Sequence, residues 1–162
     1  MRNASKMALM MCMLALFACD KPSETSMPAP EKLTRQASGY YCLMTVVDHQ
    51  GPKGQIFLTD REQPLWFTSV RDTISFTHSP EEPKNISAIY VNDMGNANWN
   101  DPGRENWIDA RKAWYVIGSK RTGGMGAPEA VPFSAKQQAE DFIRNYGGRV
   151  VDYNSIPTSY IH

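Results

Sequence analysis

The stretch from Glu129 to Tyr153, EAVPFSAKQQAEDFIRNYGGRVVDY, contains the clearest structural pattern in the chain. Its central part predicts an amphipathic helix from Ala135 to Tyr146, because apolar residues recur every three or four positions along it. These residues share one face: Ala139, Phe142, Ile143 and Tyr146. Ser134 is suited to cap the start of this helix, and the pair Gly147-Gly148 is suited to end it. An extended piece precedes the helix at 129–133, and a strand follows it at 149–153.

The same order of elements occurs earlier in the chain. Working outward, we expect a strand at 114–117, and before it strands at 41–47 and 55–58, a short extended piece at 65–67 and a strand at 87–91. Thr68 or Ser69 can cap a helix that runs to about Thr77. The fold class predicted is therefore α+β, with two small similar ββαβ-type halves at about 39–92 and 111–156. A single α+β domain with a coincidental order of elements is the alternative.

The N-terminus has the pattern of a processing segment. Arg2 and Lys6 precede an apolar run from Met7 to Ala18, which is about half the length that a membrane-spanning helix needs. Residues 1–18 are therefore expected to be a lipoprotein signal peptide, because Leu16-Phe17-Ala18-Cys19 resembles a bacterial lipobox that ends in the lipidated Cys19. An ordinary signal peptide cut nearby is the alternative. Asp20 favours retention in the inner membrane.

The next segment is polar and rich in proline. Residues 19–38 contain almost no large apolar side chain, and we expect a flexible tether there. The folded domain is expected at 39–162. The whole chain has 17 basic and 17 acidic residues and shows no basic patch, so its composition does not predict nucleic-acid binding.

The cysteine count restricts the chemistry. The chain has three cysteines; Cys12 leaves with the signal peptide and Cys19 takes the lipid, so Cys42 stays as a single thiol. One thiol cannot run an intramolecular dithiol cycle, which excludes thioredoxin-like redox chemistry. A lone thiol in an oxidising compartment is open to oxidation. Burial of the thiol or binding of a soft metal ion would explain why the chain keeps it.

Sulfur side chains near Cys42 favour the metal. In a strand at 41–47, Cys42 and Met44 would project from the same face and form a soft pair suited to Cu(I). Met125 lies in the segment Gly123-Gly124-Met125-Gly126, where the glycines predict a flexible loop and no apolar periodicity demands a large side chain. Core packing is the alternative for each of these residues, because cysteine and methionine are both often buried.

Several longer motifs lie around these residues. They are Tyr41-Cys42-Leu43-Met44, His49-Gln50-Gly51-Pro52-Lys53-Gly54-Gln55-Ile56, Ile89-Tyr90-Val91-Asn92-Asp93-Met94, Trp107-Ile108-Asp109-Ala110 and the segment 124–133. Together they resemble the NosL family of copper-binding lipoproteins, which assist maturation of nitrous oxide reductase. The resemblance implies Cu(I) binding, a lipid anchor and two ββαβ-type halves similar in fold to organomercurial lyase.

The resemblance also implies a ligand set and partners. Cys42, Met44 and Met125 match the family's metal ligands, and His49 either completes the site, only lines it, or is a solvated turn residue. Met94 is an auxiliary sulfur or a core residue, whereas His78 and His162 are expected to be incidental. The implied function is a periplasmic Cu(I) chaperone, anchored in the cell membrane and without enzyme activity. It would deliver copper to the NosD component of the Nos ABC transporter complex or to the reductase itself.

Two other functions are alternatives: a structural lipoprotein, and a thiol-dependent lyase suggested by the implied fold similarity to organomercurial lyase. A structural lipoprotein that docks a membrane complex would explain the anchor but not the free thiol. A thiol-dependent lyase would need a base to activate Cys42, and no second thiol is present to share the chemistry.

Overall fold

The computed structural model describes residues 27–162. The predicted signal peptide, the lipidated Cys19 and the part of the predicted tether at 19–26 lie outside the described residues. Among the described residues, no helix is both long enough and apolar enough to cross a membrane.

The first half is built on a four-stranded antiparallel sheet. Strand β1 (Gly54–Leu58) lies between β2 (Leu65–Phe67) and β3 (Ile86–Asn92), and helix α1 (Val70–His78) connects β2 to β3. Strand β4 (Trp107–Asp109) joins the free edge of β3, so the order is β2-β1-β3-β4. A 3-10 helix, η1 (Val46–Asp48), precedes β1.

The second half repeats this topology with a three-stranded sheet. Strand β5 (Trp114–Ile117) lies between β6 (Val131–Phe133) and β7 (Arg149–Asp152), and α2 (Lys136–Tyr146) connects β6 to β7. The short helices η2 (Ala110–Lys112), η3 (Tyr153–Ser155) and α3 (Thr158–Ile161) complete the chain. Because β2-β1-β3 and β6-β5-β7 have the same order and both contain a connecting helix, the predicted α+β fold with two ββαβ halves is confirmed.

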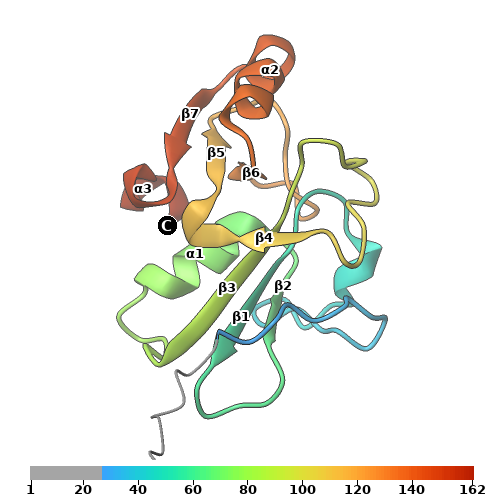
Figure 1. The fold of residues 1–162 in the computed structure, drawn as a ribbon, viewed down its shortest axis with the longest axis vertical. Helices are drawn as coiled ribbons and strands as arrows, with labels where there is room; N and C mark the ends of the chain where they lie inside the picture. Colours follow the sequence, from blue (N-terminus) through green and yellow to red (C-terminus); the bar gives the residue numbers. More distant parts are fainter. Residues whose placement is uncertain (1–26) are drawn as a thin grey trace, which may run out of the picture.

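The two sheets follow each other along the long axis of the molecule, as Figure 1 shows. The main core lies around α1, because Ile74 of α1 packs in one cluster with residues of β1 and β3 and with Tyr115 and Ile117 of β5. Val116 points to the opposite face of β5, into a second core that includes Ala139 of α2. This alternation along β5 explains why both faces of the second sheet are covered.

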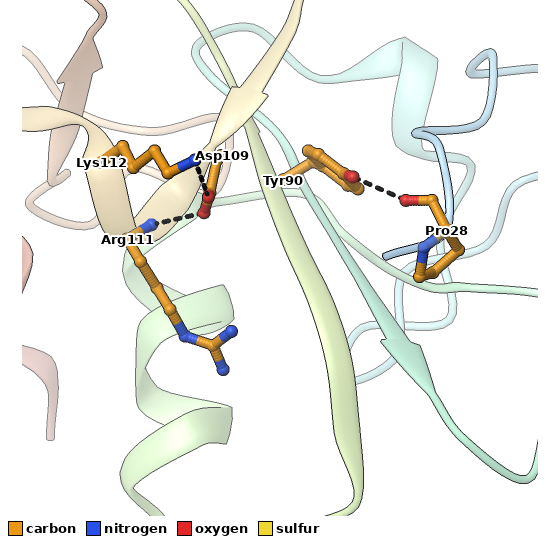
Figure 2. Close-up of polar contacts among 5 residues, drawn as sticks. All are labelled: Pro28, Tyr90, Asp109, Arg111 and Lys112. Carbon is orange, nitrogen blue, oxygen red and sulfur yellow. Dashed lines mark hydrogen bonds and ion pairs between the residues drawn. The ribbon is translucent and has the colours of Figure 1, made fainter. Parts of the chain in front are cut away.

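Local polar contacts stabilise the segment that connects the two halves. Asp109 at the end of β4 accepts a hydrogen bond from the backbone N–H of Arg111 and pairs with Lys112, which starts the η2 turn (Figure 2). The same figure shows Tyr90 of β3 donating to the carbonyl of Pro28 at 2.6 Å. The N-terminal segment is therefore tied to the middle of the first sheet.

The predicted tether ends too late in the sequence. Leu33 and Ala37 are buried with Val46, the N–H of Leu33 donates to the carbonyl of Arg104, and Glu31 exchanges two hydrogen bonds with the side chain of Gln55. Residues 28–38 are thus part of the packed domain. The composition of the segment did not predict this, because two apolar side chains and hydrogen bonds to residues far along the chain hold it in place.

The helices follow their predicted bounds, although one cap differs. Ser69 caps α1 and accepts from the N–H of Asp72, as expected. Ser134 does not cap α2; its hydroxyl donates to Asp93, and Ala135 occupies the N-cap without a side-chain hydrogen bond. The prediction that Ser134 is the cap is therefore wrong, because a carboxylate from the other half takes the hydroxyl.

We expect Gly54→Ala to lower the free energy of unfolding by about 1–3 kcal/mol, the usual cost of overpacking a core. A Cβ on Gly54 would lie 2.8 Å from the Cβ of Thr73 on α1 and closer still to its hydroxyl oxygen. Urea denaturation of the described domain measures the loss.

Thr73→Ala serves as the partner variant, since it removes two of the three crowding atoms. The double variant should then lose less stability than the sum of the single variants. Strict additivity would show that β1 and α1 do not meet at this point.

Candidate metal centre

Cys42 lies in a tight turn between Ser38 and Thr45, which form an antiparallel bridge. The N–H of Gly39 donates to the carbonyl of Met44 at 2.9 Å, and the N–H of Leu43 donates back to the carbonyl of Gly39 at 2.8 Å. Leu43 has a positive φ of 58° and is 79% exposed. A branched side chain at positive φ is strained, so the closing hydrogen bonds hold the backbone in this form.

The strand predicted at 41–47 is therefore wrong. Only Gly39 and Tyr40 pair with the edge strand β2, through Trp66, and the chain then reverses. The alternation of side chains in a strand no longer supports placing Cys42 beside Met44. The turn itself still places both sulfur residues within one short loop, with Cys42 half-buried and Met44 exposed.

Aromatic packing fixes this turn on the first half. The rings of Tyr40 and Tyr41 lie 5.8 and 5.7 Å from that of Phe67 on β2, and Tyr40 also contacts Phe76 of α1 at 5.3 Å. Both tyrosine hydroxyls donate to the carboxylate of Glu82. Burial and this acceptor raise the pKa of Tyr41, so the phenol stays a donor at neutral pH.

The thiol of Cys42 lies in a narrow space at the start of α1. Its Sγ lies 3.7 Å from the hydroxyl oxygen of Thr68, the residue before the Ser69 cap. On its other side, a Cβ placed on Gly39 would lie 2.5 Å from Sγ. Gly39 is therefore required for close approach, and Cys42 is the free cysteine of the described residues.

Met125 lies at the tip of a second closed loop. Thr122 and Pro128 form an antiparallel bridge, the N–H of Gly123 donates to Ala127, and the N–H of Gly126 donates back to Gly123. The Met125 side chain is 51% exposed, against 47% for Met44.

The glycines of this loop serve close packing. A Cβ on Gly124 would lie 2.5 Å from the Cβ of His49 and 2.9 Å from the carbonyl of Gln50. The first residues of the loop are thus pressed onto the turn that carries His49. We expected these glycines to provide flexibility, and the contacts give Gly123 and Gly124 a different role.

Hydrogen bonds from Lys53 and to Trp99 stabilise the turn that carries His49. The Lys53 ammonium donates to the carbonyls of Gln50 and Gly51, and the N–H of Gly51 donates to the carbonyl of Trp99. Burial lowers the pKa of Lys53 to about 8. The half-buried His49 therefore sits on a rigid support next to the Met125 loop.

The two loops border adjacent residues at the start of α1. The Cys42 turn contacts Thr68, and a Cβ on Gly123 would lie 3.8 Å from the Cβ of Ser69. The start of α1 thus brings together the segments that carry Cys42, Met125 and His49. Joint coordination of one metal ion by Cys42, Met44, Met125 and His49 stays a prediction.

A buried carboxyl group lies behind this junction. Oε1 of Glu129 accepts from the N–H groups of Arg71 and Ala130, whereas no described residue hydrogen bonds to its Oε2. Burial raises the pKa of Glu129 to about 8, against the effect of the two N–H donors. The roles of Glu129, Thr68 and Gly39 at this site were not predicted from the sequence; an acidic residue between apolar ones, as at Glu129, was the available signal.

The remaining candidates lie elsewhere. Met94 is buried in the second core, which is the core role left open for it, and Trp99 is buried there too. His78 is exposed at the end of α1, and His162 contacts Ser75. Within residues 27–162, no three His, Cys, Asp or Glu side chains form one cluster. The predicted ligands in the segments around the start of α1 are one thiol, two thioethers and one imidazole, and side chains of these types suit a soft metal ion.

Two known proteins are similar to this chain in sequence. The copper-binding lipoprotein NosL of Achromobacter cycloclastes is 46% identical over 153 residues, which cover 93% of this chain and 79% of the relative. The protein of the same name from Stutzerimonas stutzeri is 33% identical over 117 residues, covering 72% of this chain and 60% of the relative.

Solved structures agree with the fold. The crystal structure of the copper chaperone NosL from Shewanella denitrificans has a TM-score of 0.76 at 34% identity and covers 80% of this chain and 96% of that chain. The solution NMR structure of apo-NosL from Achromobacter cycloclastes has a TM-score of 0.52 at 50% identity, covering 67% and 88%. The NosL family model matches residues 30–161, and the chain therefore belongs to the NosL family.

Proposed function

We propose that the protein binds one Cu(I) ion through Cys42, Met44 and Met125, and passes it to another protein. The observation that carries this proposal is the half-buried free thiol at the start of α1, in a turn that also exposes Met44, while the loop that exposes Met125 borders the next residue of the same helix start. His49 either completes the coordination or lines the site. No catalysed reaction is part of the proposal.

The chemistry of the donors supports the choice of metal. Thiolate and thioether sulfur are soft ligands, which prefer Cu(I) to hard cations such as Mg²⁺ or Ca²⁺. The half-burial of the thiol limits its exposure to oxidants, while the exposed thioethers leave an approach for an incoming ligand. A site of this kind suits a carrier that must both hold and release its ion.

The relatives point in the same direction. Two similar proteins are named copper-binding lipoproteins, and a similar solved structure is named a copper chaperone. We infer from the family that copper is delivered on the periplasmic side of the membrane for assembly of the nitrous oxide reductase copper centre. NosD of the Nos ABC transporter complex and the reductase are the proposed recipients, with Cys19 as the lipid anchor in the inner membrane.

The alternatives explain fewer observations. A purely structural lipoprotein leaves the packed thiol and the exposed methionines without a role. A thiol-dependent lyase needs a base on Cys42, and the polar contact of the thiol is the hydroxyl of Thr68, which is no general base.

Cys42→Ala should abolish tight Cu(I) binding, because the cysteine supplies the anionic ligand of the site. Anaerobic titration of the domain against a competing Cu(I) chelator measures the affinity, and wild type should bind one equivalent far more tightly than Zn(II). Tight binding by Cys42→Ala would place the site elsewhere.

Met44→Ala and Met125→Ala should each weaken Cu(I) binding less than Cys42→Ala does, since thioethers are neutral ligands. Met27→Ala is the matched control, because Met27 is as exposed as Met44 but belongs to the N-terminal segment. The same chelator titration compares the three variants. An equal effect of all three would argue against specific thioether ligands.

Gly39→Ala should weaken Cu(I) binding while the domain stays folded, because the new methyl group would meet Sγ of Cys42 and displace it. The affinity is compared with that of wild type at equal circular dichroism. Unchanged affinity would mean that the thiol does not bind from this position.

Cys19→Ser should release the protein from the membrane fraction, because the proposed lipid is attached at this cysteine. Cell fractionation with immunodetection measures the distribution, and Cys42→Ser is the control that keeps the anchor. A variant that stays with the membranes would overturn the lipidation of Cys19.

A further inference from the structure

Glu129 is an ionisable residue buried where the two halves meet, and it is only 1% exposed. Burying a carboxyl group is costly unless hydrogen bonds compensate it. One oxygen is compensated by the N–H groups of Arg71 and Ala130, at 2.8 and 2.9 Å. The other oxygen has no hydrogen-bond partner among the described residues, which typically costs about 1–3 kcal/mol.

The two oxygens face different parts of the site. Oε1 reaches the first turn of α1, the helix whose preceding residue Thr68 contacts the thiol of Cys42. Oε2 faces the loop of Met125, because a Cβ on Gly123 would lie 2.7 Å from it. The carboxyl group thus lies between the helix start that contacts the Cys42 thiol and the first residues of the Met125 loop.

The backbone of Glu129 is anchored independently of this carboxyl. Its carbonyl accepts from the hydroxyl of Tyr160 at 2.9 Å, and Pro128 before it closes the Met125 loop by its bridge to Thr122. The position of the backbone is therefore determined, and the length of the side chain sets the gap between the loop and α1.

We propose that Glu129 is a positioning residue that holds the Met125 loop at a set distance from the start of α1, and thereby brings the thioether of Met125 to the copper held by Cys42. The inference rests on the proposed function and deepens it. Glu129 itself does not touch the metal in this scheme, since a carboxyl group is a hard ligand for Cu(I).

A double-mutant cycle separates positioning from general stability. Glu129→Ala should weaken Cu(I) binding about tenfold to a hundredfold, as loss of a supporting residue commonly does. Glu129→Ala combined with Met125→Ala should bind as Met125→Ala alone does, within about a factor of two, because the loop has no ligand left to position. Glu129→Ala combined with Met44→Ala should show the product of the two single effects.

Two further variants keep the test decisive. Glu129→Asp retains the carboxyl group but shortens it by one methylene, so it should behave as Glu129→Ala does and replaces it in the cycle if the alanine variant does not fold. Tyr153→Phe removes the hydrogen bond to Thr77 at the other end of α1; it should lower the melting temperature and leave Cu(I) affinity unchanged.

The outcomes are distinct from those of the proposed function. If wild type fails to bind Cu(I), the proposed function itself fails. If wild type binds and Met125→Ala weakens binding, but the effects of Glu129→Ala and Met125→Ala multiply, only the positioning role is overturned. The same holds if sulfur counting by copper X-ray absorption finds the Met125 thioether still bound in Glu129→Ala.

Discussion

The capped first turn of α1 is the constraint on which the candidate site depends. Ser69 accepts from the N–H of Asp72 and so fixes where the helix begins. Thr68, one residue earlier, then meets the thiol of Cys42, and the free N–H of Arg71, two residues later, meets Glu129. A shift of this helix start by one residue would rotate its first turn by about 100° and separate all three contacts.

The parts of the fold that follow from local patterns could be predicted from the sequence. Both helices, the capping role of Ser69 and the repeated order of strands depend on residues close together in the chain. The turn at Cys42 could not be predicted in this way. Its run of Tyr, Val and Thr has high strand propensity, but only Gly39 and Tyr40 find a partner on β2, and the rings of Tyr40 and Tyr41 pack on Phe67 instead. Tertiary contacts thus override propensity here.

In the candidate site, too, local sequence patterns could be predicted and contacts between distant residues could not. Cys42, Met44 and Met125 were predicted as ligands from the chemistry of sulfur and His49 from the family resemblance, and their joint coordination of a metal ion stays a prediction. Their supports were missed, because Gly39, Thr68 and Glu129 act through contacts with residues that are distant in sequence, such as the 58 positions between Arg71 and Glu129. Glycine at 124 looks like a sign of flexibility in the sequence, whereas its surroundings show that any larger residue would collide with His49. Distance in sequence and lack of a side chain both hide a residue's role until the fold is known.

The packing of the N-terminal segment has a consequence for the way the domain meets its partners. Tyr90 holds the chain at Pro28, which lies nine residues after Cys19. Fully extended, nine residues span only about 30 Å. If Cys19 carries the lipid, the N-terminal end of the domain stays within about 30 Å of the bilayer surface. The domain then meets a membrane-bound acceptor by lateral diffusion in two dimensions. A short tether also raises the local concentration of the two proteins near the membrane surface.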